Sequence, residues 1–349
     1  MVLGMDLELL STTLEELGEP GFRAAQVWEW TARGATGYDE MTNLPESLRA
    51  ELAARVPFST LELIDQAESR DGTVKALFHT EDGRPVESVM MRYRDGRRSI
   101  CVSSQSGCPL TCTFCATGTM AFGRNLTTAE IIDQALFFRR IEPIDHCVFM
   151  GMGEPMMNLD NVLAACDLLP DVGVTNRRTT VSTVGWLPGI EQFNAQDRPV
   201  RLALSLHAAD PTLRSKIMPV NDRYPLEDVL DACRKHWRET NRKVFIEYVM
   251  LAGVNDHTKH AKQLAAALTP HGAFKVNLIP YNPTGTGYDG SARTTIGSFR
   301  DTLLAAGVPA TVRLTRGQDI AAACGQLVAD KLQAAAVSED DAVMTTAAT

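Results

Sequence analysis

Long hydrophobic runs are absent from this sequence of 349 residues, and so is an N-terminal signal pattern. The longest apolar stretches, such as 200–206 with Arg201 inside it, fall far short of the roughly 18 residues that a membrane span requires. We therefore expect a cytoplasmic protein with no membrane partner. Hydrophobic residues make up 44% of the chain, which is enough for a sizeable folded core.

Positive charge is also scarce. The 34 Lys and Arg residues are outnumbered by 43 Asp and Glu residues, and the formal net charge is −9. The acidic excess lies at the ends, because residues 1–60 carry 10 acidic and 4 basic side chains and residues 330–349 carry 4 and 1. This balance argues against a general affinity for nucleic acid but allows local basic surfaces. The clusters that could form one are Arg92, Arg94, Arg97 and Arg98, then Arg139 and Arg140, then Arg177 and Arg178, then Arg198 and Arg201.

Hydrophobic periodicity divides the chain into four parts and predicts an α/β fold. Residues 1–60 have helical spacing and are expected to form a helical accessory domain. Residues 61–100 contain three Asp-Gly pairs between β-like runs, which is typical of a short antiparallel β meander. Residues 101–330 alternate strand-like and helical runs and predict a parallel sheet covered by helices, a partial (β/α)6 barrel. Residues 331–349 are expected to be a flexible tail.

Within the barrel, catalytic groups are expected at the C-terminal ends of the strands. One strand is expected near the cysteine cluster at 108–115. Further strands are expected at 145–150, 178–183, 200–206, 243–250, 274–280 and 310–315, and helices at 127–141, 158–169, 212–216, 225–239, 257–268 and 294–306. No internal sequence repeat is visible.

Three cysteines, Cys108, Cys112 and Cys115, lie within eight residues. Thiolates at this C-x3-C-x2-C spacing can hold three corners of a cubane iron–sulfur cluster and leave one iron open for a small ligand. The spacing resembles that of the radical S-adenosylmethionine (SAM) superfamily, where the open iron chelates the amino and carboxylate groups of SAM. A structural zinc is the alternative, but it would need a fourth Cys or His nearby. Three other cysteines are expected to be buried core residues: Cys147, Cys166 and Cys233.

Polar residues follow several expected strands. The turn at 151–155 contains Gly153 and Glu154, and its glycines allow close backbone approach while the carboxylate suits an ammonium group. Other strand ends carry hydroxyl, imidazole and amide groups at 182–183, 205–207 and 281–283. Each of these could equally be a helix cap or a turn residue. Together they would lie on one face of the barrel.

Several long strings closely resemble the dual-specificity RNA methyltransferases of the RlmN family. They are residues 101–126, 151–155, 205–207 and 313–327, with 22–26 and 41–45 in the accessory domain. The resemblance implies that Cys108, Cys112 and Cys115 hold a 4Fe–4S cluster and that Gly153, Glu154, Ser182, Ser205, Leu206, His207 and Asn282 contact SAM. It also implies that Cys324 carries a methyl group, that Cys101 resolves the intermediate through a transient disulfide, and that Glu87 accepts a proton.

The family's chemistry explains the need for two such cysteines. Adenine C2 is electron-poor and cannot attack the methyl group of SAM as a nucleophile. The resemblance implies that a first SAM methylates Cys324 and that a second is cleaved to a 5′-deoxyadenosyl radical, which activates that methyl group for addition to C2. Cys101 then attacks the Cys324 sulfur and releases the product. Each turnover would consume two SAM molecules and need an external electron donor of the flavodoxin or ferredoxin type.

The implied partners are 23S rRNA and tRNA, with the accessory domain as a possible RNA contact. The target adenine must leave its stack, so single-stranded or loop RNA is the expected substrate. Possible phosphate contacts are Arg177, Arg178, Arg198, Arg201 and Arg223. We expect a monomer.

Two alternatives stay open. The sister enzyme Cfr methylates adenine C8 by the same thiol relay, so the cysteines alone do not distinguish the two. A non-catalytic iron–sulfur RNA-binding regulator would not need both Cys101 and Cys324.

Overall fold

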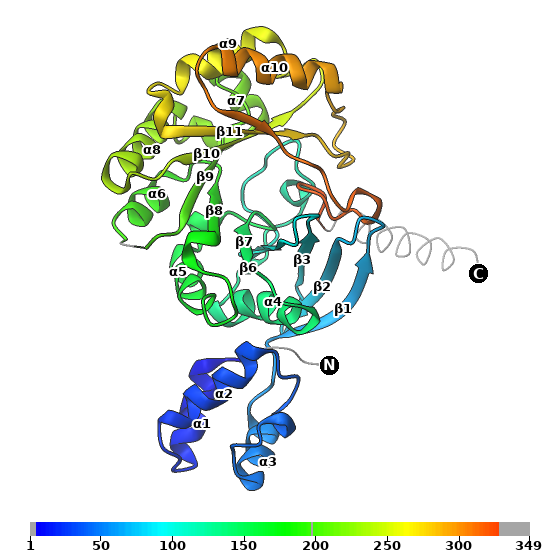
Figure 1. Ribbon diagram of the computed structural model, residues 1–349, viewed down its shortest axis with the longest axis vertical. Helices are drawn as coiled ribbons and strands as arrows, with labels where there is room; N and C mark the ends of the chain where they lie inside the picture. Colours follow the sequence, from blue (N-terminus) through cyan, green and yellow to red (C-terminus); the bar gives the residue numbers. More distant parts are fainter. Residues whose placement is uncertain (1–4, 197, 328–349) are drawn as a thin grey trace, which may run out of the picture.

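The N-terminal helices form a unit with its own hydrophobic core. The computed structural model describes residues 5–196 and 198–327. Its first helices are α1 (Leu7–Glu16), α2 (Phe22–Arg33), the 3₁₀ helix η1 (Tyr38–Glu40) and α3 (Glu46–Arg55), which lie at one end of the molecule (Figure 1). Asp6 caps α1 through its side chain, and Gly34 ends α2 in the left-handed conformation that glycine favours. Leu10, Leu14 and Val27 are among the residues buried between these helices.

The predicted meander follows. Its four antiparallel strands are β1 (Leu61–Glu68), β2 (Val74–Thr80), β3 (Pro85–Arg92) and β4 (Arg98–Val102). The three turns between them contain Gly72, Gly83 and Gly96, all with positive φ, as the Asp-Gly pairs indicate.

The parallel part of the sheet begins at the last meander strand, because β4 also pairs in parallel with β7. The strands that continue the sheet are β7 (His146–Phe149), β8 (Thr179–Thr183), β9 (Arg201–Ser205), β10 (Val244–Met250), β11 (Phe274–Pro280) and β12 (Ala310–Val312). The division of the chain at residue 100 stays a prediction, since β4 crosses that position and belongs to both parts. The expected tail, 331–349, lies outside the described residues.

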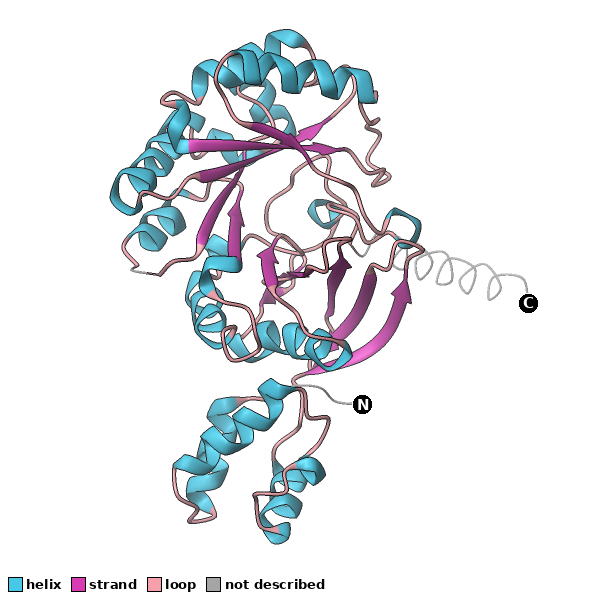
Figure 2. Ribbon diagram, in the orientation of Figure 1, coloured by secondary structure: helices cyan, strands magenta, loops and turns pink. Residues whose placement is uncertain are grey.

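Helices cover the outer face of the sheet (Figure 2). They are α4 (Thr128–Ile141), α5 (Leu159–Leu168), α6 (Leu187–Asn194), α7 (Pro211–Ile217), α8 (Leu226–Thr240), α9 (Thr258–Ala267) and α10 (Arg293–Ala305). Short 3₁₀ turns lie at η2 (Thr117–Thr119), η3 (Pro155–Met157), η4 (Asn176–Arg178), η5 (Pro219–Asp222), η6 (His271–Ala273) and η7 (Gln318–Ile320). Six strand–helix units therefore run from β4 to α10, as the expected partial (β/α)6 barrel requires. Helix α6 was not predicted, and β12 is three residues shorter than the strand expected at 310–315.

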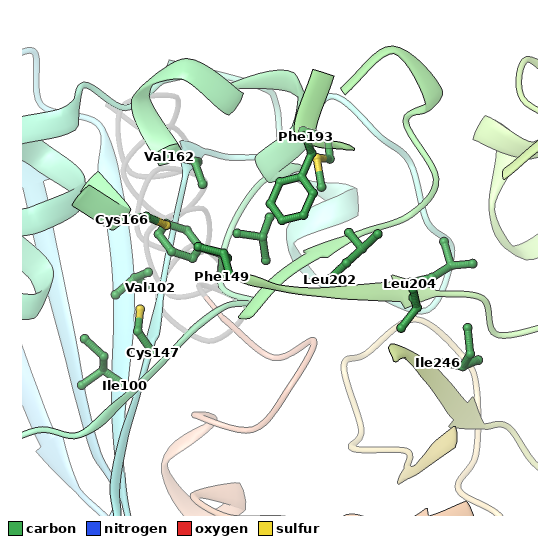
Figure 3. Packing of buried hydrophobic residues seen from close by; sticks show 14 of the residues in the cluster. Ile100, Val102, Cys147, Phe149, Val162, Cys166, Phe193, Leu202, Leu204 and Ile246 are labelled. Atoms are coloured by element: carbon green, nitrogen blue, oxygen red, sulfur yellow. The ribbon is translucent and has the colours of Figure 1, made fainter. Parts of the chain in front are cut away.

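The main core lies between the sheet and these helices (Figure 3). Ile100 and Val102 of β4 contribute to it, so the residue between them, Cys101, points to the opposite, inner face. The expected burial of Cys147, Cys166 and Cys233 is confirmed, because all three are fully buried in this core.

The barrel is open between β12 and β1, which do not pair. Residues 313–327 cross this gap (Figure 1). The backbone N–H of Gly317 donates to Asp71 Oδ2 at 3.1 Å, and Asp319 accepts hydrogen bonds from Ser69 Oγ and the Arg70 N–H. This segment, which contains Cys324, is thereby fastened to the turn between β1 and β2.

Candidate active site

A cavity lies at the C-terminal ends of the parallel strands, where the sequence analysis expected the chemistry. We call it the first cavity. Its lining includes the three clustered cysteines, Gly153 and Glu154 after β7, Ser182 in β8, Ser205 in β9, His207, Glu247 in β10, and Asn282 and Cys324. Most of the site residues implied by the family resemblance are thus brought together.

The three cysteines lie on a loop that is closed at its base. Two short strands, β5 (Gln105–Ser106) and β6 (Arg124–Asn125), pair antiparallel and hold the ends of loop 107–123 together. The loop folds tightly back on itself. A Cβ on Gly107 would lie 2.3 Å from the Ala121 carbonyl oxygen, and one on Gly118 would lie 2.7 Å from that of Cys112.

Burial governs the protonation of these thiols. It raises the pKa of Cys108 to about 12 and raises the pKa of Cys112 and of Cys115 above the usual thiol value. The mutual repulsion of the charged forms raises the pKa of Cys112 further. All three thiols line the first cavity. The Arg214 guanidinium lowers the pKa of Cys112, but burial outweighs it, so the group fits a site whose thiolates form when a positively charged metal centre binds.

The positions of the possible metal-ligating side chains also concern the zinc alternative. Among the described residues, no three Cys, His, Asp or Glu side chains converge closely enough to hold a single metal ion. A tetrahedral zinc needs such convergence. A cubane cluster does not, since each of its irons takes one thiolate. The three cysteines of the loop therefore suit three corners of such a cluster.

The glycine turn after β7 lies directly against the loop after β4. A Cβ on Gly151 would lie 2.6 Å from Ser103 Oγ, and one on Gly153, whose φ is +95°, would lie 2.5 Å from Gln105 Cβ. This close contact sets the position of Glu154. Its carboxylate accepts hydrogen bonds from the backbone N–H groups of Met156 at 3.1 Å and Val184 at 2.9 Å.

Burial raises the pKa of Glu154 to about 7, although its hydrogen bonds work in the opposite direction. The Glu154 carboxyl is therefore a buried group whose negative charge becomes more favourable when a cation arrives. A ligand ammonium would supply such a cation.

His207 and two serines occupy the adjacent strand ends. Ser182 Oγ and Ser205 Oγ lie 3.4 Å apart. His207 Nδ1 accepts the backbone N–H of Val249 at 3.0 Å, so the neutral ring carries its proton on Nε2. Burial lowers the pKa of His207 to about 3, which keeps the ring neutral. The ring also contacts Phe114 edge-on. The site thus contains two hydroxyls and one neutral imidazole donor.

Leu206 is the one predicted SAM contact that does not line the first cavity. Its side chain is fully buried in the main core. Its backbone N–H donates to the Glu247 carbonyl at 3.0 Å, and its carbonyl accepts Arg214 Nε at 3.2 Å. Both backbone groups therefore already have protein partners.

A second cavity adjoins the first and contains Cys101. Cys324 lines both cavities, as do Asn282 and Met150. Cys101 and Cys324, far apart in the sequence, therefore face the same space. Asn282 helps to hold this arrangement, because its Nδ2 donates to the Cys324 carbonyl at 3.2 Å and its Oδ1 accepts Gln318 Nε2 at 2.8 Å.

The two thiols influence each other. Desolvation raises the pKa of Cys101 to about 12, and a negative charge on Cys324 raises it further. Desolvation by the cavity walls raises the pKa of Cys324 to about 11. The Arg313 guanidinium lowers the pKa of both thiols. Thiolate formation at Cys101 is therefore favoured by the backbone N–H of Met150 and by Arg313, which acts on both thiols.

Glu87 lies beside the second cavity but does not line it. It is 2% exposed on β3 and lies 3.4 Å from Lys75 Nζ. Its backbone N–H approaches the Met152 sulfur at 3.3 Å. Val89, two residues further along the same face of β3, does line the cavity. The structure therefore brings Glu87 near the two cysteines without giving it direct access to the cavity.

One ion pair of the site was missed by the sequence analysis. Glu247 lines the first cavity, Arg313 lines the second, and Arg313 Nη1 lies 3.2 Å from Glu247 Oε2. Asn277 Nδ2 donates to the other carboxylate oxygen at 2.9 Å. The available signal was a lone glutamate inside the apolar strand β10.

Four of the five predicted phosphate contacts do not lie near the face of the cavities, where they were expected. Arg177 and Arg178 immediately precede β8, and Arg198 and Arg201 lie at the start of β9. They therefore lie at the N-terminal edge of the sheet, opposite the cavities. Arg223 alone of the five follows the C-terminal end of a strand, and its guanidinium lies 5.0 Å from the ring of Trp186.

Comparison with known proteins agrees with this geometry. Residues 102–265 match the radical SAM superfamily, and residues 2–57 match the N-terminal domain of ribosomal RNA large subunit methyltransferases. A protein of Thermus thermophilus named "Probable dual-specificity RNA methyltransferase RlmN" is 45% identical over 331 residues, 92% of each chain. The "Dual-specificity RNA methyltransferase RlmN" of Anaeromyxobacter dehalogenans is 44% identical over 338 residues, 93% of this chain and 90% of that one. This chain belongs to the RlmN family.

A solved structure supports the RlmN assignment at the level of the fold. The radical SAM methyltransferase from Sphaerobacter thermophilus superposes with a TM-score of 0.89 at 42% identity, covering 95% of this chain and all of that one. Membership of the radical SAM superfamily implies a 4Fe–4S cluster and SAM as cofactors, and the cysteine loop and the Glu154 turn of this RlmN-family chain fit them. In residues 5–196 and 198–327, no helix is long and apolar enough to cross a membrane.

Proposed function

We propose that this chain methylates C2 of an adenine in 23S rRNA and in tRNA through a methyl-cysteine relay. One observation carries the proposal: Cys324 lines both the cavity of the three clustered cysteines and the cavity of Cys101. A methyl group on the Cys324 sulfur could therefore be activated by cofactors in the first cavity and released by Cys101 in the second. The relatives named RlmN support the RNA substrate.

The first cavity would bind the cofactors. Cys108, Cys112 and Cys115 would hold the cluster. The Glu154 carboxylate would accept hydrogen bonds from the ammonium group of SAM, while the nearby hydroxyls and His207 Nε2–H would bind its oxygen atoms. When bound, these cofactors supply a carbon-centred radical that can remove a hydrogen atom from a methyl group.

The second cavity would receive the base. Glu87, which lies beside this cavity 3.4 Å from Lys75 Nζ, would take the C2 proton once it gains access to the base. The unpaired electron left by the radical addition would return to the oxidised cluster. Cys101 as thiolate would then attack the Cys324 sulfur, so that an S–S bond forms as the C–S bond to the base breaks, and the electron pair left on carbon takes up a proton to complete the methyl group. Arg313 would favour the attacking thiolate. We infer two SAM molecules per turnover, an external electron donor for cluster and disulfide, and action as a monomer.

The test is anaerobic reconstitution of the protein with iron, sulfide, SAM and reductant, followed by reaction with 23S rRNA fragments and tRNA. Digested RNA is analysed by mass spectrometry against 2-methyladenosine and 8-methyladenosine. The proposal expects 2-methyladenosine from wild type and none from Cys324→Ala. The 8-methyl product would identify a Cfr-type enzyme. Failure of wild type to cleave SAM would favour a non-catalytic iron–sulfur protein.

A further inference from the structure

An aromatic ring that lines the second cavity has two guanidinium groups close to it. Tyr93 follows β3 and lines this cavity. The guanidinium carbon of Arg97 lies 4.3 Å from the centre of its ring, and that of Arg316 lies 4.8 Å from it. Leu314 also lines the cavity and is 79% exposed, more than any other large apolar side chain in the described residues. We call Tyr93, Arg97, Leu314 and Arg316 the cavity rim.

The two rim arginines are weakly engaged within the protein. Arg97 Nε lies 3.5 Å from Asp95 Oδ2, and both side chains are exposed. Arg316 Nη1 lies 3.9 Å from Asp71 Oδ2. The exposed Arg97 pair contributes little. The Arg316 side chain is only 14% exposed, and its Nη1 also donates to the Asp71 carbonyl at 3.4 Å. The Nε atom of Arg316 is buried with no hydrogen-bond partner among the described residues. The exposed Arg97 guanidinium is thus able to pair with an added anion, and the Arg316 guanidinium, which has one nitrogen without a hydrogen-bond partner in the described residues, can do so where it lines the second cavity.

The nearby carboxylates do not cancel this capacity. Asp71 accepts hydrogen bonds from the backbone N–H groups of Thr73 and Gly317. Asp319 accepts hydrogen bonds from Ser69 Oγ and the Arg70 N–H. Their oxygens are engaged in fastening residues 313–327 to the β1–β2 turn, and of these two carboxylates only Asp71 lies within ion-pair distance of a rim arginine.

We propose that the cavity rim binds the single-stranded RNA that flanks the target base. Arg97 and Arg316 pair with its phosphates, while Tyr93 and Leu314 contact the bases next to the one that enters the cavity. This inference rests on the proposed function and names the residues that recognise its substrate.

Three features favour single-stranded RNA as the occupant. Guanidinium groups complement phosphates in charge and geometry. An aromatic ring with arginines beside it is a surface on which unpaired bases stack. The exposed Leu314 can contact the face of a neighbouring base, which is accessible only once the strand is unstacked. The rim also borders the cavity that contains Cys101 and Cys324, so a strand bound there would deliver its base to them.

The test is binding of a fluorescent RNA hairpin with an adenine in its loop to the full-length, reconstituted protein between 50 and 200 mM salt. The double variant Arg97→Gln/Arg316→Gln is expected to bind at least about tenfold more weakly, because two charge-assisted contacts are lost. Its salt slope should be smaller in magnitude by about 1.4, the value for two phosphate contacts on a single strand. Leu314→Ser should raise the KM for RNA about fivefold with the salt slope unchanged, since Leu314 carries no charge.

A matched control is Arg177→Gln/Arg201→Gln, which removes the same charge from exposed positions at the opposite edge of the sheet. It should bind RNA within twofold of wild type. The conservative pair Arg97→Lys/Arg316→Lys should recover most of the salt slope, which would exclude misfolding as the cause of the loss.

The outcomes separate this inference from the proposed function. If wild type methylates RNA but the Gln pair keeps wild-type affinity, or the control loses as much, the rim assignment is overturned alone. If a fully paired duplex binds as tightly as the hairpin loop, the single-stranded occupant is wrong. If wild type neither binds nor methylates RNA, both proposals fall.

Discussion

The two cavities that meet at Cys324 are built in different ways. The first is walled by a loop closed by β5 and β6 and by the ends of parallel strands, with glycines in close backbone contact. The second is walled by the inner face of the meander and by residues 313–327, which beyond β12 belong to no sheet strand in the described structure. Changes in the first cavity should therefore abolish SAM cleavage, whereas changes around the second should leave SAM cleavage intact and affect methyl transfer to RNA or release of the product.

The largest expected effects come from replacing two cysteines, one that would hold the cluster and one that would carry the methyl group. Cys112→Ala should lose both SAM cleavage and RNA methylation, because one corner of the cluster is missing. Cys324→Ala should lose methylation below detection while still cleaving SAM to 5′-deoxyadenosine. Chromatography of the nucleoside and mass spectrometry of digested RNA measure the two activities side by side.

The core thiol Cys166 provides the control. Cys166→Ala should keep both activities, since that side chain lies in the main core away from both cavities. If Cys324→Ala lost SAM cleavage as completely as Cys112→Ala, the two cysteines would not have separate roles.

The next largest expected effect is on the affinity for SAM and concerns Glu154 in the first cavity. Burial raises its pKa to about 7, so the carboxyl is progressively protonated as the pH falls through 7 and can no longer pair with an ammonium. SAM affinity of wild type should therefore weaken below pH 7 and level off above it. Glu154→Gln should bind SAM about a hundredfold more weakly at pH 8, the loss of a buried charge-assisted contact.

The pH dependence identifies the cause of that loss. The Gln variant should show a flat SAM affinity between pH 6 and 8 in calorimetry. A variant that is weak but keeps the wild-type pH dependence would show that another group titrates.

A smaller effect is expected where the two cavities are joined. Desolvation raises the pKa of Cys101 to about 12, and Arg313 opposes this. Arg313→Gln should raise the Cys101 pKa further and slow the thiolate attack about tenfold, so the covalent RNA–protein adduct should accumulate on denaturing gels. Raising the pH from 7 to 9 should relieve the defect, because a larger fraction of Cys101 then ionises.

Cys101→Ala is the reference for this experiment, since its adduct should persist at every pH. If Arg313→Gln accumulates no adduct, or if its adduct persists equally at pH 9, the arginine does not act through the thiolate.

The sequence predicted the first cavity better than the second, for a physical reason. The cysteine loop and the turn at Glu154 are local motifs, and parallel strands end at one edge of a sheet, so Ser182, Ser205 and His207 had to meet there. The side chain of Leu206 was not so constrained, since neighbouring residues at a strand end point in opposite directions.

The second cavity depends on contacts between distant parts of the chain. The pair Glu247–Arg313 forms only because β10 and the segment after β12 approach each other. No local pattern shows that approach. The expected position of the phosphate contacts was wrong for a related reason. Clustered arginines, such as Arg177 and Arg178, do not reveal which edge of the sheet they occupy until the strands are placed.

The smallest expected effect tests how residues 313–327 are held. Asp71 Oδ2 accepts the Gly317 N–H at 3.1 Å, and hydrogen bonds from Thr73, Gly317 and Ser69 lower the pKa of Asp71 despite the opposing effect of burial. Asp71→Asn can place an amide N–H against the Gly317 N–H, which removes this contact at a cost of about 1 kcal/mol. We expect a threefold to fivefold fall in methylation rate with SAM cleavage unchanged, and faster hydrogen exchange at residues 313–320.

Asp301→Asn, which alters only a surface pair with Arg300, should change neither measurement. Faster exchange without slower methylation would mean that the position of Cys324 depends on Asn282 rather than on the β1–β2 turn.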